Sequence, residues 1–185
     1  AELNRFFFKY IIHKKPYVTI KIAQTLDGYI SRNREKQSWI TSYKAKKVVH
    51  RWRSEYDAVL VGAGTINIDN PLLTVREVTG RNPIRLILDG NLKIQKNNKI
   101  FHDNFTNNII IITSKNTLPK KIESLANYGC KIIRMPIDKN GRININDILI
   151  KLAEIGITSI LVEGGQNIFS QFISEKHADE IKLFI

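Results

Sequence analysis

The sequence contains a single cysteine, Cys130. One cysteine forms no intramolecular disulfide and supplies no thiolate cluster for zinc or iron, so a reducing, cytoplasmic compartment is the default expectation. The histidines are also few, and they show neither metal-ligand spacing nor the partners of a catalytic triad: His13, His50, His102 and His177. We therefore expect no metal centre and no nucleophilic catalysis.

Long apolar runs, linkers and repeats are missing as well. No run approaches the roughly 18 residues that cross a bilayer, and the basic, aromatic start at 5–9 lacks a cleavage-like continuation. We expect no membrane partner. No Pro/Gly/Ser-rich stretch divides the 185 residues, and no internal repeat is evident, so one domain is predicted.

Acidic residues are scarce relative to basic ones. Seventeen Asp and Glu face 29 Lys and Arg, which gives a formal net charge of +12. This excess favours a polyanionic partner, and both a nucleic acid and a small phosphorylated substrate satisfy it. The basic residues are spread along the chain, and neither an RNP-like aromatic motif nor a zinc-finger spacing is present. The charge alone leaves both classes open.

Hydrophobic periodicity predicts alternating strands and helices. The expected helices lie within 1–15 and at 42–56, 118–127, 145–155 and 167–174; the expected strands are 17–23, 58–61, 84–88, 109–113, 131–135, 159–162 and 180–185. In the 42–56 helix, Ala45, Val48, Val49 and Trp52 form the apolar stripe. Such alternation predicts an α/β fold, with a mostly parallel sheet covered by helices on both faces. Ligands then belong at the carboxyl ends of the strands.

The stretch 57–76 looks most like part of a ligand site. An apolar strand, 58–61, leads into a small-residue turn, 62–64, where the backbone can approach a ligand closely. A polar loop is expected next, with Pro71 pushing Asn70 toward an extended conformation. The loop offers a hydroxyl, a carboxylate, an amide and a guanidinium: Thr65, Asp69, Asn70 and Arg76.

A second glycine turn follows the strand 159–162. Glu163 precedes Gly164 and Gly165, which lead into a helix whose free amides and dipole favour phosphate. Glu163 either complements that dipole or, if partly buried, serves as an acid or as an acceptor for a ligand hydroxyl. Arg53 and Lys21 could also be solvated surface residues with no role in a site, because a charged residue on a helix or strand commonly faces water.

Several motifs in series extend over 16–185. They read PYVTIKIAQTLDG, SWIT, HRWRSEYDAVLVGAGTINIDNPLLTVR, NPIRLILDG, ILVEGG and ADEIKLF. Their order and spacing resemble the reductase domain of the bacterial bifunctional riboflavin-biosynthesis proteins, which has a dihydrofolate-reductase-like fold. A series of this kind is far more specific than either glycine turn alone.

The resemblance implies NADPH-dependent reduction of the ribosyl group of 5-amino-6-(5-phosphoribosylamino)uracil to a ribityl chain. It places Lys21 and Glu163 at the reacting ribose as catalytic residues. The substrate contacts that it implies fall on Gln37, Arg53, Leu73, Arg76 and Glu163. The implied cofactor contacts are Ala23, Trp39, Thr65, Asp69, Gly165, Gln166 and Asn167. NADPH rests on the resemblance, since no single motif here fixes a contact to the 2′-phosphate.

The sequence departs from the family pattern in three places. Gln37 stands where a serine is usual, and Gly90 replaces another frequent serine after the third strand. The chain also ends at Ile185, before the usual final strands, so we expect a C-terminally shortened domain with an open sheet edge.

The resemblance also suggests partners. Residues 1–15 resemble the connector that follows a zinc deaminase domain, and 16–185 correspond to the reductase. No H-x-E or P-C-x-x-C motif is present, so we expect deaminase activity to come from a separate chain. A homodimer is implied. Another NADPH reductase of the same fold, such as a folate reductase, is the alternative function, followed by a basic nucleic-acid-binding module.

Overall fold

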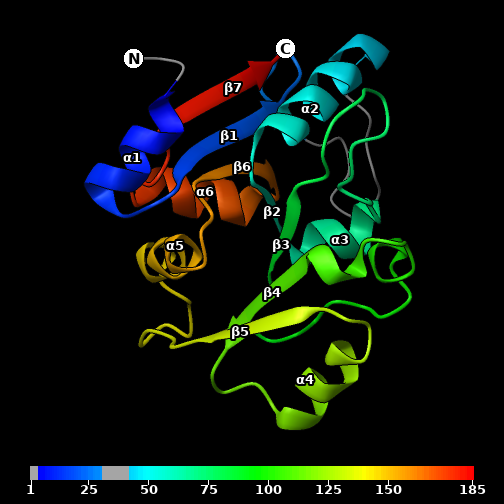
Figure 1. Ribbon diagram of the computed structural model, residues 1–185, viewed down its shortest axis with the longest axis vertical. Coiled ribbons are helices and arrows are strands. Elements are labelled where there is room, and N and C mark those ends of the chain that lie inside the picture. Colours follow the sequence, from blue (N-terminus) through cyan, green and yellow to red (C-terminus); the bar gives the residue numbers. More distant parts are fainter. Residues whose placement is uncertain (1–3, 31–41) are drawn as a thin grey trace.

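A seven-stranded sheet forms the centre of the protein, and all its strands run parallel (Figure 1). The computed structural model describes residues 4–30 and 42–185. In spatial order the strands are β5 (Lys131–Met135), β4 (Ile109–Ser114), β3 (Ile84–Leu88), β2 (Ala58–Gly62), β6 (Ser159–Gly164), β1 (Tyr17–Ala23) and β7 (Glu180–Phe184). The expected α/β class and the helix and strand pattern are confirmed, and the sheet is wholly rather than mostly parallel.

Strand position follows the sequence pattern. The interior strands β2 and β4 are buried along their whole length, as continuous apolar runs require when helices cover both faces of a sheet. The edge strand β7 alternates between half-buried and exposed residues, with Ile181 and Leu183 on its exposed side. Edge strands keep one row of backbone groups unpaired, so partial exposure is expected there.

Helices cover the two faces separately (Figure 1). On one face, α5 (Ile145–Glu154) and α6 (Gln166–Ser174) pack on a core that includes Ile20, Leu60 and Val162. On the other face, α3 (Ala63–Asp69) and α4 (Pro119–Ala126) pack on a core that includes Val61, Ile87 and Ile111. Two 3-10 turns, η2 (Lys99–Phe101) and η3 (Thr106–Asn108), connect β3 to β4.

The first helix, α1 (Arg5–His13), docks on the β1 end of the sheet. The Phe6 ring lies 5.3 Å from that of Tyr17 and 4.9 Å from that of Tyr56, and Lys9 Nζ lies 2.7 Å from a carboxylate oxygen of Asp179. The helix predicted within 1–15 is thus confirmed. Its role as a connector remains a prediction.

Helix α2 (Tyr43–Glu55) begins as predicted, with the Ser42 hydroxyl accepting a hydrogen bond from the Ala45 N–H at 3.3 Å. Its buried face overlaps the predicted apolar stripe only in part. Val49 is buried and Trp52 half-buried as predicted, whereas Val48 is exposed and the polar His50 and Arg53 are buried. The prediction was wrong for these polar residues because they find partners inside the protein.

The region after β2 also differs from expectation. The predicted small-residue turn and the first part of the predicted polar loop form the helix α3, which starts at Ala63 directly after the strand, whereas the part that contains Arg76 is a loop as predicted. Asn70 ends this helix with φ 45° and ψ 49°, a left-handed conformation rather than the extended one predicted. Pro71 disfavours only the right-handed helical region for Asn70, and asparagine tolerates the left-handed region better than most residues.

Candidate functional site

The candidate site lies at the carboxyl ends of β1, β6 and β2. Lys21 lies toward the end of β1, and Glu163 lies at the corresponding place in β6, the next strand in the sheet. Helix α2 and the loop after α3 bring further charged groups to the same edge. In an open parallel sheet this edge is where ligands bind.

A buried ion pair joins α2 to β6. Arg53 Nε donates to Glu163 Oε1 at 2.6 Å, and Arg53 Nη2 donates to Glu163 Oε2 at 2.7 Å. The two side chains are only 11% and 7% exposed. Burial opposes ionisation of Glu163, but the Arg53 charge and its hydrogen bonds hold the pKa of that carboxyl below its usual range. Glu163 is thus an ionised acceptor in this arrangement.

Arg53 also binds the loop that contains Arg76. Its Nη1 donates to the carbonyl oxygen of Thr74 at 3.1 Å. Arg76 Nη1 donates to the Thr74 hydroxyl at 2.6 Å, so Thr74 holds both guanidinium groups. Arg76 is exposed and forms no ion pair within the described ranges 4–30 and 42–185. The partly buried portion of this side chain and the charge of Arg53 both lower the pKa of Arg76, because each disfavours its positive charge.

His50 supports this loop from α2. Its Nδ1 accepts a hydrogen bond from the backbone N–H of Arg76 at 2.9 Å. Burial lowers the pKa of His50 to about 4, and the charges of Arg53 and Arg76 add to this effect. Glu77 and Glu163 act in the opposite direction but are outweighed. His50 is therefore neutral near neutral pH.

Lys21 acts electrostatically on two carboxylates. Its positive charge lowers the pKa of Glu163 and opposes the effect of burial, which raises the pKa of Asp69 above its usual range. Lys21 forms no ion pair with any residue in the part of the chain that the structure describes. An ammonium group beside two carboxylates, but bound to neither, is available to a ligand.

The turn from β6 into α6 is closely packed against Thr65. A Cβ atom added to Gly164 or Gly165 would lie 3.1 Å or 3.0 Å from the Thr65 hydroxyl oxygen, so glycine is needed for this approach. The peptide bond between the two glycines is cis. Among the described residues, no side chain caps the start of α6, where Gln166 and Asn167 are exposed. Its free amides fit a phosphate group.

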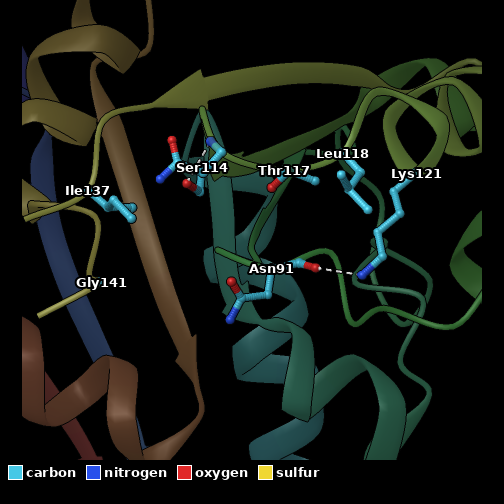
Figure 2. Close-up of a pocket in the computed structure, with 8 residues that line it drawn as sticks. Asn91, Ser114, Thr117, Leu118, Lys121, Ile137 and Gly141 are labelled. Carbon is cyan, nitrogen blue, oxygen red and sulfur yellow. Dashed lines mark hydrogen bonds between the residues drawn. The ribbon is translucent and has the colours of Figure 1, made fainter.

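A hollow of about 220 Å³, separate from the residues described above, opens beside the ends of β3 and β4 (Figure 2). Asn91 and Lys121 lie on one side of it, and the Lys121 ammonium donates to the Asn91 carbonyl oxygen at 3.3 Å. Ser114, Asn116 and Thr117 contribute hydroxyl and amide groups. Polar groups with a single cation suit a small anionic group.

The structure thus brings together four residues that the sequence nominated separately: Lys21, Arg53, Arg76 and Glu163. Arg53 and Glu163 form a buried pair. Arg53 is therefore not a solvated surface residue, and Glu163 does more than complement a helix dipole. Leu73 is buried with φ 58°, and Ala23 ends β1 opposite Phe184. Gln37 and Trp39 lie outside the described residues.

Sequence reasoning missed His50 and Thr74. His50 precedes Arg53 by one helical turn on α2, and that spacing places both on one face of the helix. This spacing was the one sign in the sequence that His50 belongs to the site. It becomes informative only once Arg53 is known to be buried. In 4–30 and 42–185, no cluster of His, Cys, Asp or Glu is arranged to hold a metal ion, and no helix is long and apolar enough to cross a membrane.

Comparison with known proteins identifies similar chains. The family model described as the RibD C-terminal domain matches residues 16–185. "Riboflavin biosynthesis protein RibD" of Aquifex aeolicus is 38% identical over 185 residues, which is 100% of this chain and 50% of that protein. A reductase of Archaeoglobus fulgidus, named for 2,5-diamino-6-ribosylamino-4(3H)-pyrimidinone 5′-phosphate, is 28% identical over 92% of this chain and 80% of its own length.

Solved structures agree with these relatives. A Thermotoga maritima protein described as a diaminohydroxyphosphoribosylaminopyrimidine deaminase/5-amino-6-(5-phosphoribosylamino)uracil reductase is 38% identical, with a TM-score of 0.75 over 96% of this chain and 47% of that one. Acinetobacter baumannii RibD is 26% identical, with a TM-score of 0.84 over 99% of this chain and 49% of its own. This chain spans about half the length of the RibD relatives that it matches. The expected dihydrofolate-reductase-like fold is confirmed, and the chain belongs to the RibD C-terminal domain family, the pyrimidine reductase family of riboflavin biosynthesis.

Proposed function

We propose that this domain reduces the ribosyl group of 5-amino-6-(5-phosphoribosylamino)uracil to a ribityl chain, with NADPH as the reductant. The observation that carries the proposal is the exposed Arg76 guanidinium, which lacks an acidic partner among the described residues and is held beside the buried Arg53–Glu163 pair. A sugar phosphate fits this combination, since it needs a cation for its phosphate and acceptors for its hydroxyl groups.

Arg76 is the proposed main phosphate ligand. The contacts of Arg53 with Glu163 and Thr74 use three of the five N–H groups of its guanidinium. Arg53 can therefore contribute its charge and a further hydrogen bond to the phosphate. The guanidinium edge that would bind a phosphate through two hydrogen bonds is already bound to Glu163. Arg76 therefore has the larger part in phosphate binding.

Lys21 and Glu163 are the proposed residues at the reacting carbon. Opening the ribose ring leaves C1′ double-bonded to nitrogen, and reduction then adds a hydride to C1′ and a proton to the nitrogen. The Lys21 ammonium is the proposed proton source, because it lies beside the ionised Glu163. Glu163 accepts hydrogen bonds from sugar hydroxyl groups and so orients the ribose. Leu73 is buried and belongs to the same loop as Arg76. It is the proposed apolar contact of the substrate.

The residues at the sheet edge fit a dinucleotide. NADPH, when bound, supplies the hydride. We propose that the free amides at Gly165, Gln166 and Asn167 hold its pyrophosphate, with Thr65 against the same turn. Asp69 and Ala23 are proposed contacts beside Lys21, and Gln37 and Trp39 keep the roles that the family resemblance implies.

The hollow at Lys121 favours NADPH over NADH. Strands β3 and β4 are the second and third strands from β6, which at the usual strand spacing corresponds to about 10–15 Å. An extended dinucleotide that starts at α6 reaches this distance. A 2′-phosphate in the hollow would meet the Lys121 ammonium and the hydroxyls of Ser114 and Thr117.

Supply of the substrate requires a deaminase reaction. The described residues contain no metal cluster for it, and the Thermotoga maritima relative is described as both deaminase and reductase. We propose that a separate chain supplies this chemistry, that residues 1–15 correspond to the connector of the family, and that the reductase acts as a homodimer.

The test is oxidation of NADPH by the purified protein with each of three acceptors. We expect turnover with 5-amino-6-(5-phosphoribosylamino)uracil and none with dihydrofolate. The third acceptor is 2,5-diamino-6-ribosylamino-4(3H)-pyrimidinone 5′-phosphate, because it appears in the name of the Archaeoglobus fulgidus relative. Preferential turnover of that compound would assign the reaction to the stage before deamination, and activity on dihydrofolate alone would overturn the proposal.

A further inference from the structure

The loop that contains Arg76 has few backbone partners of its own. No helix or strand is assigned between Asn70 and Pro83. Side chains fix it instead: the Val75 N–H donates to Asn82 Oδ1 at 2.7 Å, and the Arg76 N–H donates to His50 Nδ1 at 2.9 Å. The conformation of this loop therefore depends on a small number of side-chain acceptors.

Helix α2 holds the loop at two points one turn apart. Arg53 donates to the Thr74 carbonyl oxygen, and His50 accepts from the Arg76 N–H. The side chain of Arg76 is fixed in turn by the Thr74 hydroxyl. Among the side chains of the described residues in these contacts, His50 is the one that bonds to the backbone of Arg76 itself.

The hydrogen bond defines the state of the His50 ring. Because Nδ1 accepts, it carries no proton, and a neutral ring has its proton on Nε2. A proton on Nδ1 would place two N–H donors against each other. It would also add a third positive charge beside Arg53 and Arg76, with Glu77 and Glu163 as the opposing carboxylates. Neutral His50, which is only 4% exposed, is suited to a fixed acceptor role.

We propose that His50 is a positioning residue for the phosphate subsite: its Nδ1 holds the Arg76 backbone so that the guanidinium faces the substrate phosphate. This inference rests on the proposed role of Arg76. It assigns His50 no contact with the substrate and no proton transfer. It requires an acceptor at the Nδ1 position, and it does not require an imidazole ring.

That requirement separates positioning from packing. In His50→Asn the side-chain oxygen lies near the position of Nδ1, whereas His50→Gln places its amide near that of Nε2. His50→Leu fills the space without any acceptor. His102→Leu is the matched control, because His102 is an exposed histidine that contacts the Lys96 carbonyl oxygen far from the proposed site in sequence.

Calorimetric titration with ribose 5-phosphate, in the presence of NADP⁺, measures the subsite without turnover. We expect His50→Leu and His50→Gln to weaken binding about tenfold, the factor that corresponds to one lost hydrogen bond. His50→Asn should stay within about threefold of the unmodified protein, and His102→Leu should bind as the unmodified protein does. NADP⁺ affinity should be the same in all variants.

The kinetic readout uses the substrate with and without its phosphate. His50→Leu should raise KM for the phosphorylated substrate while kcat and the KM for NADPH change little, and it should not alter kcat/KM for the dephosphorylated compound. Two outcomes overturn the inference: unchanged binding in His50→Leu, or equal weakening in His50→Asn and His50→Leu. Normal ribose 5-phosphate binding without any turnover would instead overturn the proposed reaction and leave the role of His50 standing.

Discussion

Arg53 of α2 and Glu163 of β6 form a bidentate pair with N–O distances of 2.6 Å and 2.7 Å. The pair fixes the helix to the carboxyl end of a central strand. It also makes Glu163 an ionised acceptor, and it occupies the Nε/Nη2 edge of the Arg53 guanidinium. Arg76, on the loop that Arg53 and His50 both hold, stays available for an anion at this site.

Removing one partner of this pair should destabilise the protein strongly. We expect Glu163→Gln or Arg53→Met to lower the free energy of unfolding by about 3–5 kcal/mol, because each leaves a buried charge unpaired. The double variant Arg53→Met/Glu163→Met should be more stable than either single variant and inactive. Denaturant titration measures all three, and Lys151→Ala, at an exposed pair, should cost less than about 1 kcal/mol. Equal losses at the buried and exposed pairs would contradict this account.

Arg76→Ala should separate substrate binding from cofactor binding. Affinity for ribose 5-phosphate should fall by at least about tenfold, because a charge-assisted contact is lost, while NADPH affinity stays nearly constant. Arg81→Ala is the control, since Arg81 is exposed and pairs with Asp57 just before β2 begins, away from the carboxyl end of the strand. Calorimetry measures both affinities. An equal loss of both in Arg76→Ala would mean that Arg76 is not the phosphate ligand.

Alanine substitutions at Gly165, beside Thr65, and at Gly64, in α3, should change the stability of the protein in opposite directions. Gly165→Ala places a Cβ 3.0 Å from the Thr65 hydroxyl oxygen, so we expect a loss of roughly 1–3 kcal/mol of stability and weaker NADPH binding. Gly64→Ala meets nothing within 4 Å and should gain roughly 0.5 kcal/mol from higher helix propensity. Thermal unfolding shows both effects. A neutral Gly165→Ala would show that the turn tolerates a side chain.

Lys121→Ala should reveal whether the hollow beside β3 and β4 binds a 2′-phosphate. We expect NADP⁺ and 2′,5′-ADP to bind about tenfold more weakly, while NAD⁺ affinity is unchanged, because only the former two carry that phosphate. Lys120→Ala, at the exposed neighbouring position on α4, should leave all three affinities as they are. If Lys121→Ala weakens NADP⁺ and NAD⁺ equally, the hollow does not discriminate between them.

Stability should decrease in mild acid through His50. Its pKa is about 4 in the folded protein and about 6.5 when unfolded, so the unfolded state binds the proton first as the pH falls. The contribution of neutral His50 to the free energy of unfolding is complete above pH 6.5. It decreases by on the order of 3 kcal/mol as the pH falls toward 4. His50→Asn should remove this part of the pH dependence in denaturant titrations between pH 7 and 4.5. Parallel curves for the two proteins would show that His50 titrates normally.

Local sequence patterns were sufficient to predict the layered fold. Continuous apolar runs such as 58–61 and 109–113 mark strands that must be covered on both faces, and helices alternating with them leave a parallel sheet as the solution. That topology also predicted the edge at which Lys21 and Glu163 lie, because parallel strands end together. Local periodicity is sufficient for these conclusions, since each depends on neighbours within a few residues.

The partners of the polar residues depend on how distant parts of the chain pack together. Arg53 and Glu163 are 110 residues apart, and His50 and Arg76 are 26 apart, so no local pattern relates them. Burial of His50 and Arg53 shifted the buried face of α2 away from Val48, and the segment directly after β2 became a helix because Ala63 and Ile66 pack on the core. Strand order and packing bring such residues together, and a one-dimensional pattern does not contain that information.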